Sequence, residues 1–357
     1  MSGLHLTRSR GRLAFRLDRP AVSGVLRPRL VLTWLLLALA VFAALCLTVG
    51  AGAGDYPISP AAVVRALWGE GEPADLFVVW ELRLPRAAVG LLAGAAFGLS
   101  GAIFQSVTRN PLASPDMIGI THGAGAAVAA GIVLGLGTGL GLQGLGLAGA
   151  IGAGLAIYLL AWKRGTTGYR IVLVGIGVSW MCVSFTSYLL SRAEIFQAHK
   201  VLGWLVGNLN DRGWAHAGPL AAALAVLLPV VLLLVRLQRT LRLGDEVAAG
   251  LGTPVQRVRL ALLLCGAACA AFATAAAGPI LFVALAAPQI AQRTARTSAP
   301  PATAAALTGA AIVLVGDLIS QRLMAESVLP VGVVTGVLGA PFLLWQLARA
   351  NRMGTGG

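Results

Sequence analysis

Apolar residues run through this chain in long uninterrupted stretches, and polar residues gather in the short segments between them. About 20 apolar residues in a helix are enough to cross the hydrocarbon core of a bilayer. The stretches do not alternate every second residue, which favours helices over a membrane barrel. The pattern therefore predicts an all-α polytopic membrane protein with about ten transmembrane helices, at residues 30–50, 84–106, 115–136, 143–162, 171–190, 216–235, 258–277, 280–295, 302–321 and 331–348.

Composition agrees with one helical bundle and leaves no room for a sizeable soluble domain. Hydrophobic residues make up 57% of the 357 residues and charged residues 11%. The 46 glycines suit close approach between helices. We expect a basic N-terminal arm over residues 1–29, a ten-helix membrane domain over residues 30–350, and within it an exposed inner segment over residues 236–259.

The formal net charge of +14 follows membrane topology and does not indicate a nucleic-acid partner. With the N-terminus inside, most of the 27 lysines and arginines fall in inner segments, as the positive-inside rule requires. We therefore expect a multi-pass protein of the plasma (inner) membrane, with both termini cytoplasmic and basic residues against anionic lipid. The outer segments hold only Arg65, Arg83, Arg86, Arg192, Lys200, Arg212 and Arg322.

The N-terminal arm is too long for the first part of a secretory signal, and the apolar run behind it has the length of a membrane span. Ala51-Gly52-Ala53 resembles a cleavage site, but an uncleaved first span is the better interpretation. All four cysteines fall in predicted spans without a nearby histidine or carboxylate, so we predict free thiols, no metal and no cofactor. They are Cys46, Cys182, Cys265 and Cys269.

Three short segments carry a more specific pattern. Arg83 and Arg86 flank Pro85 at the outer entry of the second span, where they alone suggest interface anchors. Residues 109–120 contain Pro111 and Pro115, which end one helix and start another in an ordered re-entry turn. Residues 243–252 read as a short inner helix with acidic residues in its first turn, either a capped surface helix or a rigid knob for a cytoplasmic partner.

Together and in this order, these segments resemble the iron–siderophore and vitamin B12 permease family of ABC importers. Residues 277–283, 329–336 and 339–342 also match, and the resemblance covers about residues 30–350. It implies a ten-helix permease subunit that pairs with a second, identical or homologous permease subunit on two ATP-binding subunits. An extracytoplasmic substrate-binding protein would deliver the substrate, here expected to be a ferric siderophore.

The resemblance also implies roles for individual residues. Arg83, Arg86 and Arg322 are the candidates for docking the binding protein. The inner helix, through Gly244, Asp245, Glu246, Ala248, Leu251 and Gly252, would sit in a cleft of the ATPase, and the fifth and tenth spans would line the pathway. Structural or gating roles fall to Asn110, Pro111, Pro115, Gly119, Gly278, Pro279, Pro288, Gln289, Asp317, Pro330, Gly332 and Pro341.

Two departures from the family pattern bear on these roles. Pro288 is followed by Gln289 in place of the usual histidine, and Gln292 stands where an arginine is common. Glutamine hydrogen-bonds but cannot become cationic, so a proton-linked role is not expected there. Gln321 replaces the arginine four residues after Asp317, with Arg322 following. Asp317 within a span requires a partner, and we favour a structural hydrogen bond over a substrate contact.

Other readings are weaker. A vitamin B12 or haem importer permease shares this architecture, and the sequence does not name the chelate. An ion-coupled secondary transporter would carry membrane carboxylates, and only Asp317 and Asp116 qualify. No Gly-Lys pair exists for a phosphate-binding loop, so ATP hydrolysis is expected from a partner. An intramembrane enzyme would need a nucleophile–base or metal constellation, which His122 and scattered serines do not form.

Overall fold

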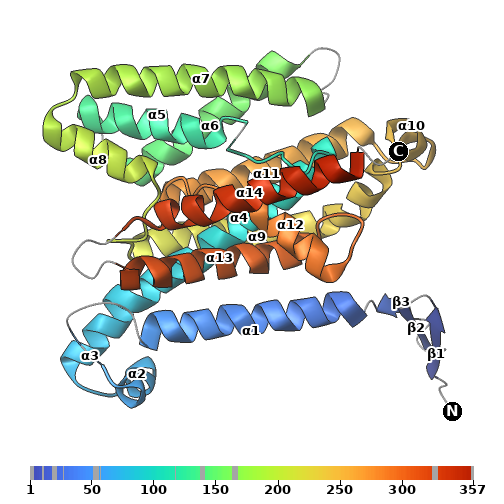
Figure 1. The fold of residues 1–357 in the computed structure, drawn as a ribbon, viewed down its shortest axis with the longest axis horizontal. Helices are drawn as coiled ribbons and strands as arrows, with labels where there is room; N and C mark the ends of the chain where they lie inside the picture. The colour runs from blue at the N-terminus through green and yellow to red at the C-terminus, as the bar shows by residue number, and fades with distance from the viewer. Residues whose placement is uncertain are drawn as a thin grey trace.

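A computed structural model describes residues 4–9, 12–17, 22–26, 28–50, 56, 58–116, 118–136, 141–162, 168–323 and 329–354. The Ala51-Gly52-Ala53 segment lies outside the described residues. The helices, in chain order, are α1 (Pro28–Gly50), α2 (Pro60–Leu67), α3 (Pro73–Phe77), the π-helix η1 (Val78–Arg83), α4 (Leu84–Thr108), α5 (Ile120–Val133), α6 (Gly141–Ala161), α7 (Gly168–Arg192), α8 (Ile195–Leu205), α9 (Trp214–Leu241), α10 (Asp245–Gly250), α11 (Val255–Ala277), α12 (Val283–Ala295), α13 (Ala302–Leu323) and α14 (Val331–Gly354) (Figure 1).

Each of the ten expected spans corresponds to one helix, namely α1, α4, α5, α6, α7, α9, α11, α12, α13 and α14. Within the described ranges, seven helices are long and apolar enough to cross a membrane by length and composition, and α5 and Val331–Trp345 of α14 are shorter apolar helices. From the apolar runs, α5 was expected to begin at residue 115 and α12 at residue 280. Both begin later, at Ile120 and Val283, because a non-helical segment enters first.

The N-terminal arm contains structure that its basic composition did not predict. Three antiparallel strands follow one another as β1 (Leu4–Ser9), β2 (Arg12–Leu17) and β3 (Val22–Leu26). Leu4 lies opposite Leu17, and Leu13 lies opposite Leu26. This small sheet precedes α1 and lies apart from the bundle (Figure 1), so the membrane domain itself is helical.

Figure 1 separates the two ends of the bundle. The sheet, α10 and the C-terminus lie at one end, whereas α2, α3 and α8 lie at the other. At the second end, α2 begins as the sequence predicts, with Ser59 as N-cap and Pro60 in the first turn. Indole N–H groups connect the neighbouring elements there, because Trp80 donates to the Ala66 carbonyl and Trp214 donates to the Trp80 carbonyl, both at 2.8 Å.

Two runs of helices repeat the same order of lengths, a feature that inspection of the sequence did not show. Helices α4, α5, α6 and α7 have 25, 14, 21 and 25 residues, and α11, α12, α13 and α14 have 23, 13, 22 and 24. A residue in the left-handed region precedes each short helix, Gly119 at φ 96° and Phe282 at φ 66°. The turn into the short helix therefore recurs in both halves.

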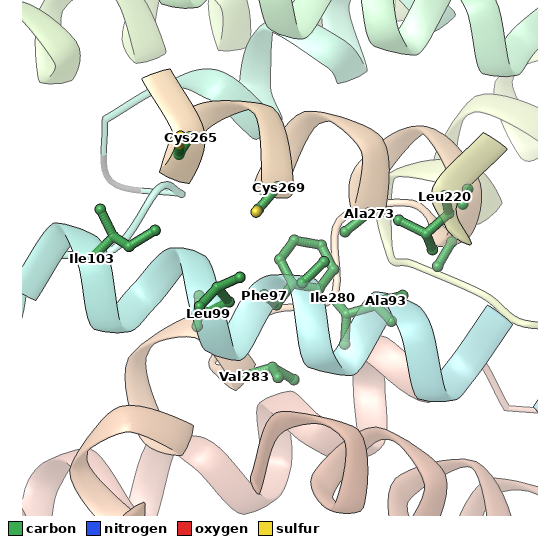
Figure 2. Packing of buried hydrophobic residues seen from close by; sticks show 14 of the residues in the cluster. Ala93, Phe97, Leu99, Ile103, Leu220, Cys265, Cys269, Ala273, Ile280 and Val283 are labelled. Atoms are coloured by element: carbon green, nitrogen blue, oxygen red, sulfur yellow. The ribbon is translucent and has the colours of Figure 1, made fainter. Parts of the chain in front are cut away.

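Helix α4 is central to the bundle and packs against α9, α11, α12 and α13. Figure 2 shows part of the resulting core, with Phe97 and Leu99 of α4 facing Ile280 and Val283, and Cys265 and Cys269 on the adjacent α11. The thiols are free and buried among apolar side chains. Helices α5, α6, α7 and α8 form a second group on one side (Figure 1), and a second buried cluster joins this group to α4 and α11.

Contact between α4 and α13 requires glycine. A Cβ at Gly98 would overlap the carbonyl oxygen of Ala305, and one at Gly94 would lie 2.5 Å from the carbonyl oxygen of Gly309. Real side chains essentially never come so close. Small residues allow such backbone contact between membrane helices, where dispersion forces and not water exclusion hold helices together.

We expect Gly98→Ala to destabilise the folded protein by about 1–3 kcal/mol, because the added methyl group must push α4 and α13 apart. Gly152→Ala on α6 is the matched control, since a Cβ there meets nothing within 4 Å. Thermal unfolding of the detergent-purified chain measures both effects. Equal melting temperatures for the two variants would contradict the assigned packing.

Candidate functional site

The short helix expected at residues 243–252 is present as α10, between α9 and α11. Gly244 enters it with φ 110° and Gly252 leaves it with φ 80°, backbone angles that favour glycine. Ala248 is fully buried, and its N–H donates to the Gly244 carbonyl at 2.9 Å. The segment is closed by Thr240 and Thr253, whose hydroxyl oxygens lie 2.8 Å apart. The helix is therefore a fixed knob rather than a loose loop.

Asp245 ties α10 to the bundle. Its carboxylate accepts two hydrogen bonds from Nη2 of Arg259 on α11, both at 2.8 Å, and Arg259 is 7% exposed. Nη2 of Arg109, at the end of α4, lies 3.3 Å from Oδ1 of Asp245 and donates to the Leu241 carbonyl at 2.6 Å. We call Asp245, Arg109 and Arg259 the inner clasp. It links the knob to the C-terminal end of α4 and to the N-terminal part of α11.

Several apolar side chains of the knob are exposed. Leu243, Val247 and Leu251 occur at intervals of four residues and are 59%, 51% and 62% exposed. Val247 lies within α10, Leu251 caps its end one turn later, and Leu243 precedes the Gly244 that enters the helix. Glu246 is also exposed. The knob thus exposes three large apolar side chains, Leu243, Val247 and Leu251, which we call the apolar stripe. Exposed apolar patches of this kind mark contact surfaces.

Near the other end of the bundle, a buried ion pair joins α4 to α13. Arg86 donates from Nη2 to Oδ1 of Asp317 at 2.8 Å and from Nε to Oδ2 at 3.1 Å. Gln321 donates to Oδ2 at 2.6 Å. The Asp317 side chain is 1% exposed and that of Arg86 is 21% exposed. Asp317 is therefore paired inside the protein, and Gln321 contributes one of its partners.

Arg83 is placed differently from the docking residue that the sequence analysis expected. It is buried, and its guanidinium donates to the carbonyl oxygens of Val49 at 3.1 Å and Tyr56 at 3.3 Å. Val49 belongs to the last turn of α1, where carbonyls lack helical partners and favour a cation. An exposed docking role does not fit this geometry. Arg83 instead caps the end of α1.

A polar cavity of about 600 Å³ lies beside these arginines. Its lining carries charges of both signs, from Glu81, Asp211, Arg83, Arg86 and Arg212. Arg212 donates to the Asn208 carbonyl at 3.2 Å, and burial lowers the pKa of its guanidinium while nearby Asp211 raises it. Arg322 is exposed on the last turn of α13, next to the cavity residue Gln321.

The residues to which we assigned gating roles occupy turns and close contacts. Oδ1 of Asn110 accepts from the Leu112 N–H at 2.9 Å, and Pro111 and Pro115 lie in the segment between α4 and α5 that ends at Gly119. Gly278 has φ 75° and precedes Pro279 between α11 and α12. Gly332, after Pro330, donates its N–H to the Gly207 carbonyl at 3.1 Å. Pro288 and Pro341 lie inside α12 and α14.

Gln289 takes part in a buried hydrogen-bond chain between α12 and α4. Its Nε2 donates to Oε1 of Gln105 at 2.6 Å, and Nε2 of Gln105 donates to the Leu285 carbonyl at 3.1 Å. Gln105 and Gln289 are 4% and 6% exposed. Gln289 therefore donates the hydrogen bond that the buried, uncharged side chain of Gln105 accepts.

Several residues of these sites were not predicted to belong to them from the sequence. Arg109 and Arg259 were counted only as inner positive charges, and Gln105 was not assigned a role. The partners of Arg109 and Gln105 lie more than 100 residues away, so no local pattern could reveal them. By contrast, Val247 and Leu251 stand one turn apart in the expected short helix, and this spacing was visible in the sequence.

The chain is similar to known proteins over almost its whole length. The model of the FecCD transport family matches residues 36–349. The chain is 41% identical over 327 residues to the ferric enterobactin transport system permease protein FepG of Escherichia coli strain K12, covering 91% of this chain and 98% of that protein. It is 40% identical over 318 residues to the achromobactin transport system permease protein CbrC of Dickeya dadantii strain 3937, covering 88% and 90%.

A solved structure shares the fold. It is described as a metal-chelate type ABC transporter in an inward-facing conformation, and it matches with a TM-score of 0.76 over 89% of this chain and 99% of that one, at 21% identity. The all-α polytopic class predicted from the sequence is thus confirmed for the membrane domain.

The Arg86–Asp317 pair generates a stability prediction. Arg86→Gln should destabilise the protein by about 3–5 kcal/mol, because Asp317 then remains buried without its cation. Adding Asp317→Asn should restore much of the loss, since both charges are then absent. Thermal unfolding of the purified single and double variants measures the coupling. Arg65→Gln, an exposed arginine on α2, is the control and should shift stability by less than about 0.5 kcal/mol. Additive single effects would contradict a direct pairing.

Proposed function

The chain belongs to the FecCD transport family, and we propose that it is the permease subunit of an ATP-driven importer that carries a ferric siderophore into the cytoplasm. One observation carries this proposal, namely 41% identity over 98% of a permease named for ferric enterobactin transport. Similarity of this extent includes the membrane helices and the turns between them. A vitamin B12 or haem importer is the alternative within the same family.

The driving force is proposed to come from two separate ATP-binding subunits. The chain has no Gly-Lys pair that could form a phosphate-binding loop. The inner clasp and the apolar stripe suit a rigid contact through which closure of an ATPase is transmitted. In this assignment Leu243, Val247 and Leu251 touch the partner, as do Glu246 and the glycines at 244 and 252. Asp245 and Ala248 hold the helix from inside.

A second permease subunit is proposed to pack against α7 and α14. These helices expose large apolar side chains, including Trp180 and Met181 on α7 at 67% and 71%, and Val337 and Leu338 on α14 at 67% and 58%. Spans of this kind form the pathway when two copies face one another. The prolines and glycines in the turns and at the helix ends, together with Asn110, would let the helices tilt as rigid bodies.

The membrane orientation is proposed from charge. The basic segments and α10 lie at the cytoplasmic end of the plasma (inner) membrane, with both termini inside. The cavity beside Arg86 then opens outward, where an extracytoplasmic substrate-binding protein would deliver the chelate. Arg322 is the exposed docking candidate, Arg86 contributes from the cavity wall, and Arg83 has the structural role described above.

Changes on the two sides of α10 should have different effects. Val247→Glu with Leu251→Glu should reduce co-purification with the ATP-binding subunits about tenfold or more, because two charges enter an apolar contact. Asp245→Asn with Arg259→Gln should preserve assembly but reduce the substrate-stimulated part of ATP hydrolysis, because the knob loses its link to α11. Gln256→Glu adds charge to the same end outside the stripe and serves as the control. Unchanged assembly and unchanged stimulation in both pairs would reject the coupling assignment.

Uptake by the reconstituted transporter tests the proposed function. Vesicles containing this chain, its ATP-binding subunits and its binding protein should accumulate labelled ferric siderophore only when ATP is supplied. Labelled cobalamin and haem are the competing substrates, and accumulation of either one in place of the siderophore would favour the alternative. Accumulation against a gradient by the chain alone would overturn the ATP-driven mechanism.

A further inference from the structure

An apolar groove lies between the two groups of helices, where α6 meets α11. It has a volume of about 550 Å³. Its floor includes Phe104, Ile118 and Ile157, which are 2–3% exposed, and its rim includes Ile151, Leu155 and Leu264, which are 55–57% exposed. Among the described residues of the lining, Tyr158 alone has a polar side chain. A groove of this composition does not hold ordered water, because water needs polar partners.

The length of the groove corresponds to one leaflet. Along α11 it extends from Leu260 to Ala271, a distance of about 16 Å at 1.5 Å per residue. The hydrocarbon core of a bilayer is about 30 Å thick. The groove starts a little more than one turn after Val255, the first residue of α11 at the α10 end. Measured along α11, it therefore extends from about 7 Å to about 24 Å beyond Val255, within the apolar part of the helix.

The chemistry of the lining selects the occupant. The described lining residues are apolar apart from Tyr158, so they offer almost no hydrogen-bond partner to a polar ligand. A hydrocarbon chain needs no such partner and can follow an irregular apolar surface.

Basic and aromatic residues surround the mouth. Arg257 lies one turn before the lining residue Leu260 on α11 and is exposed. Arg170 is exposed and directly precedes the lining residue Ile171 on α7. The ring of Tyr158 packs against Trp162 with centroids 5.4 Å apart, as in the aromatic belt at a membrane surface. Basic pockets between helices at the cytoplasmic surface recognise anionic lipid head groups.

We propose that this groove binds one acyl chain of an anionic phospholipid of the inner leaflet, with the head group at Arg257 and Arg170. The assignment of the leaflet rests on the orientation given under the proposed function, but the binding itself does not. The lipid fills the space between α6 and α11 and so becomes part of the contact between the two groups of helices.

Native mass spectrometry of the detergent-purified full chain, titrated with phosphatidylglycerol or phosphatidylethanolamine, tests the proposal. Gly154 lines the groove, and a Cβ there meets nothing within 4 Å. Gly154→Trp should therefore fill the groove without a backbone clash and reduce retention of the first phosphatidylglycerol about tenfold or more. Gly152→Trp is the matched control, since Gly152 has equal space but lies outside the lining, and its retention should equal that of the unaltered chain.

The head group has its own test. Arg257→Gln should reduce the preference for phosphatidylglycerol over phosphatidylethanolamine about fivefold, the effect of one basic residue near an anionic surface. Arg236→Gln, an exposed arginine near the end of α9, should leave it unchanged. Equal retention by Gly154→Trp and Gly152→Trp, or binding without preference for the anionic lipid, would overturn the proposal. The assay needs neither ATPase nor siderophore, so failed uptake does not decide it, and failed lipid binding does not decide the transport function.

Discussion

The structure depends on the backbone contact between α4 and the helices α12 and α13. Besides Gly94 and Gly98 at α13, Gly101 meets α12, where a Cβ would overlap the Ala284 carbonyl oxygen. In a bilayer the surrounding lipid is as apolar as a leucine side chain, so burial of apolar surface does not by itself select a helix partner. Close contact and polar links do. Three glycines on one side of α4 thus decide which helices form a unit with it.

Polar links strengthen the same unit and extend it to both membrane surfaces. Arg86 joins the N-terminal end of α4 to α13, Gln105 joins its C-terminal half to α12 through Gln289, and Arg109 just after its C-terminal end reaches the inner clasp. From residue 86 to residue 109 a helix is about 35 Å long, slightly more than the hydrocarbon core. Helix α4 therefore connects the knob on one side of the membrane with the polar cavity on the other.

Much of this architecture could be predicted from the sequence, because the signals that define it are local. Continuous apolar runs gave the ten spans, and two acidic residues before a closing glycine gave α10. Long-range partners could not be predicted in the same way. Arg83 looked like a surface residue because its partners, Val49 and Tyr56, lie 34 and 27 residues earlier in the chain. The strands of the arm have no apolar run, and their residues were counted only for charge.

The knob could be predicted only in part, because Arg109, one of the partners of Asp245, also lies far away in the sequence. Asp245 was correctly placed in the first turn of α10, where a helix dipole favours an acid, but the direction of its side chain depends on Arg259 and Arg109. Once these partners are known, two parts of the knob can be distinguished. Asp245 connects α10 to Arg109 and Arg259 in the inner clasp, whereas the side chains of the apolar stripe remain exposed. Helices α4 and α11 begin the two runs of similar helix lengths, so the inner clasp joins α10 to the first helix of each run.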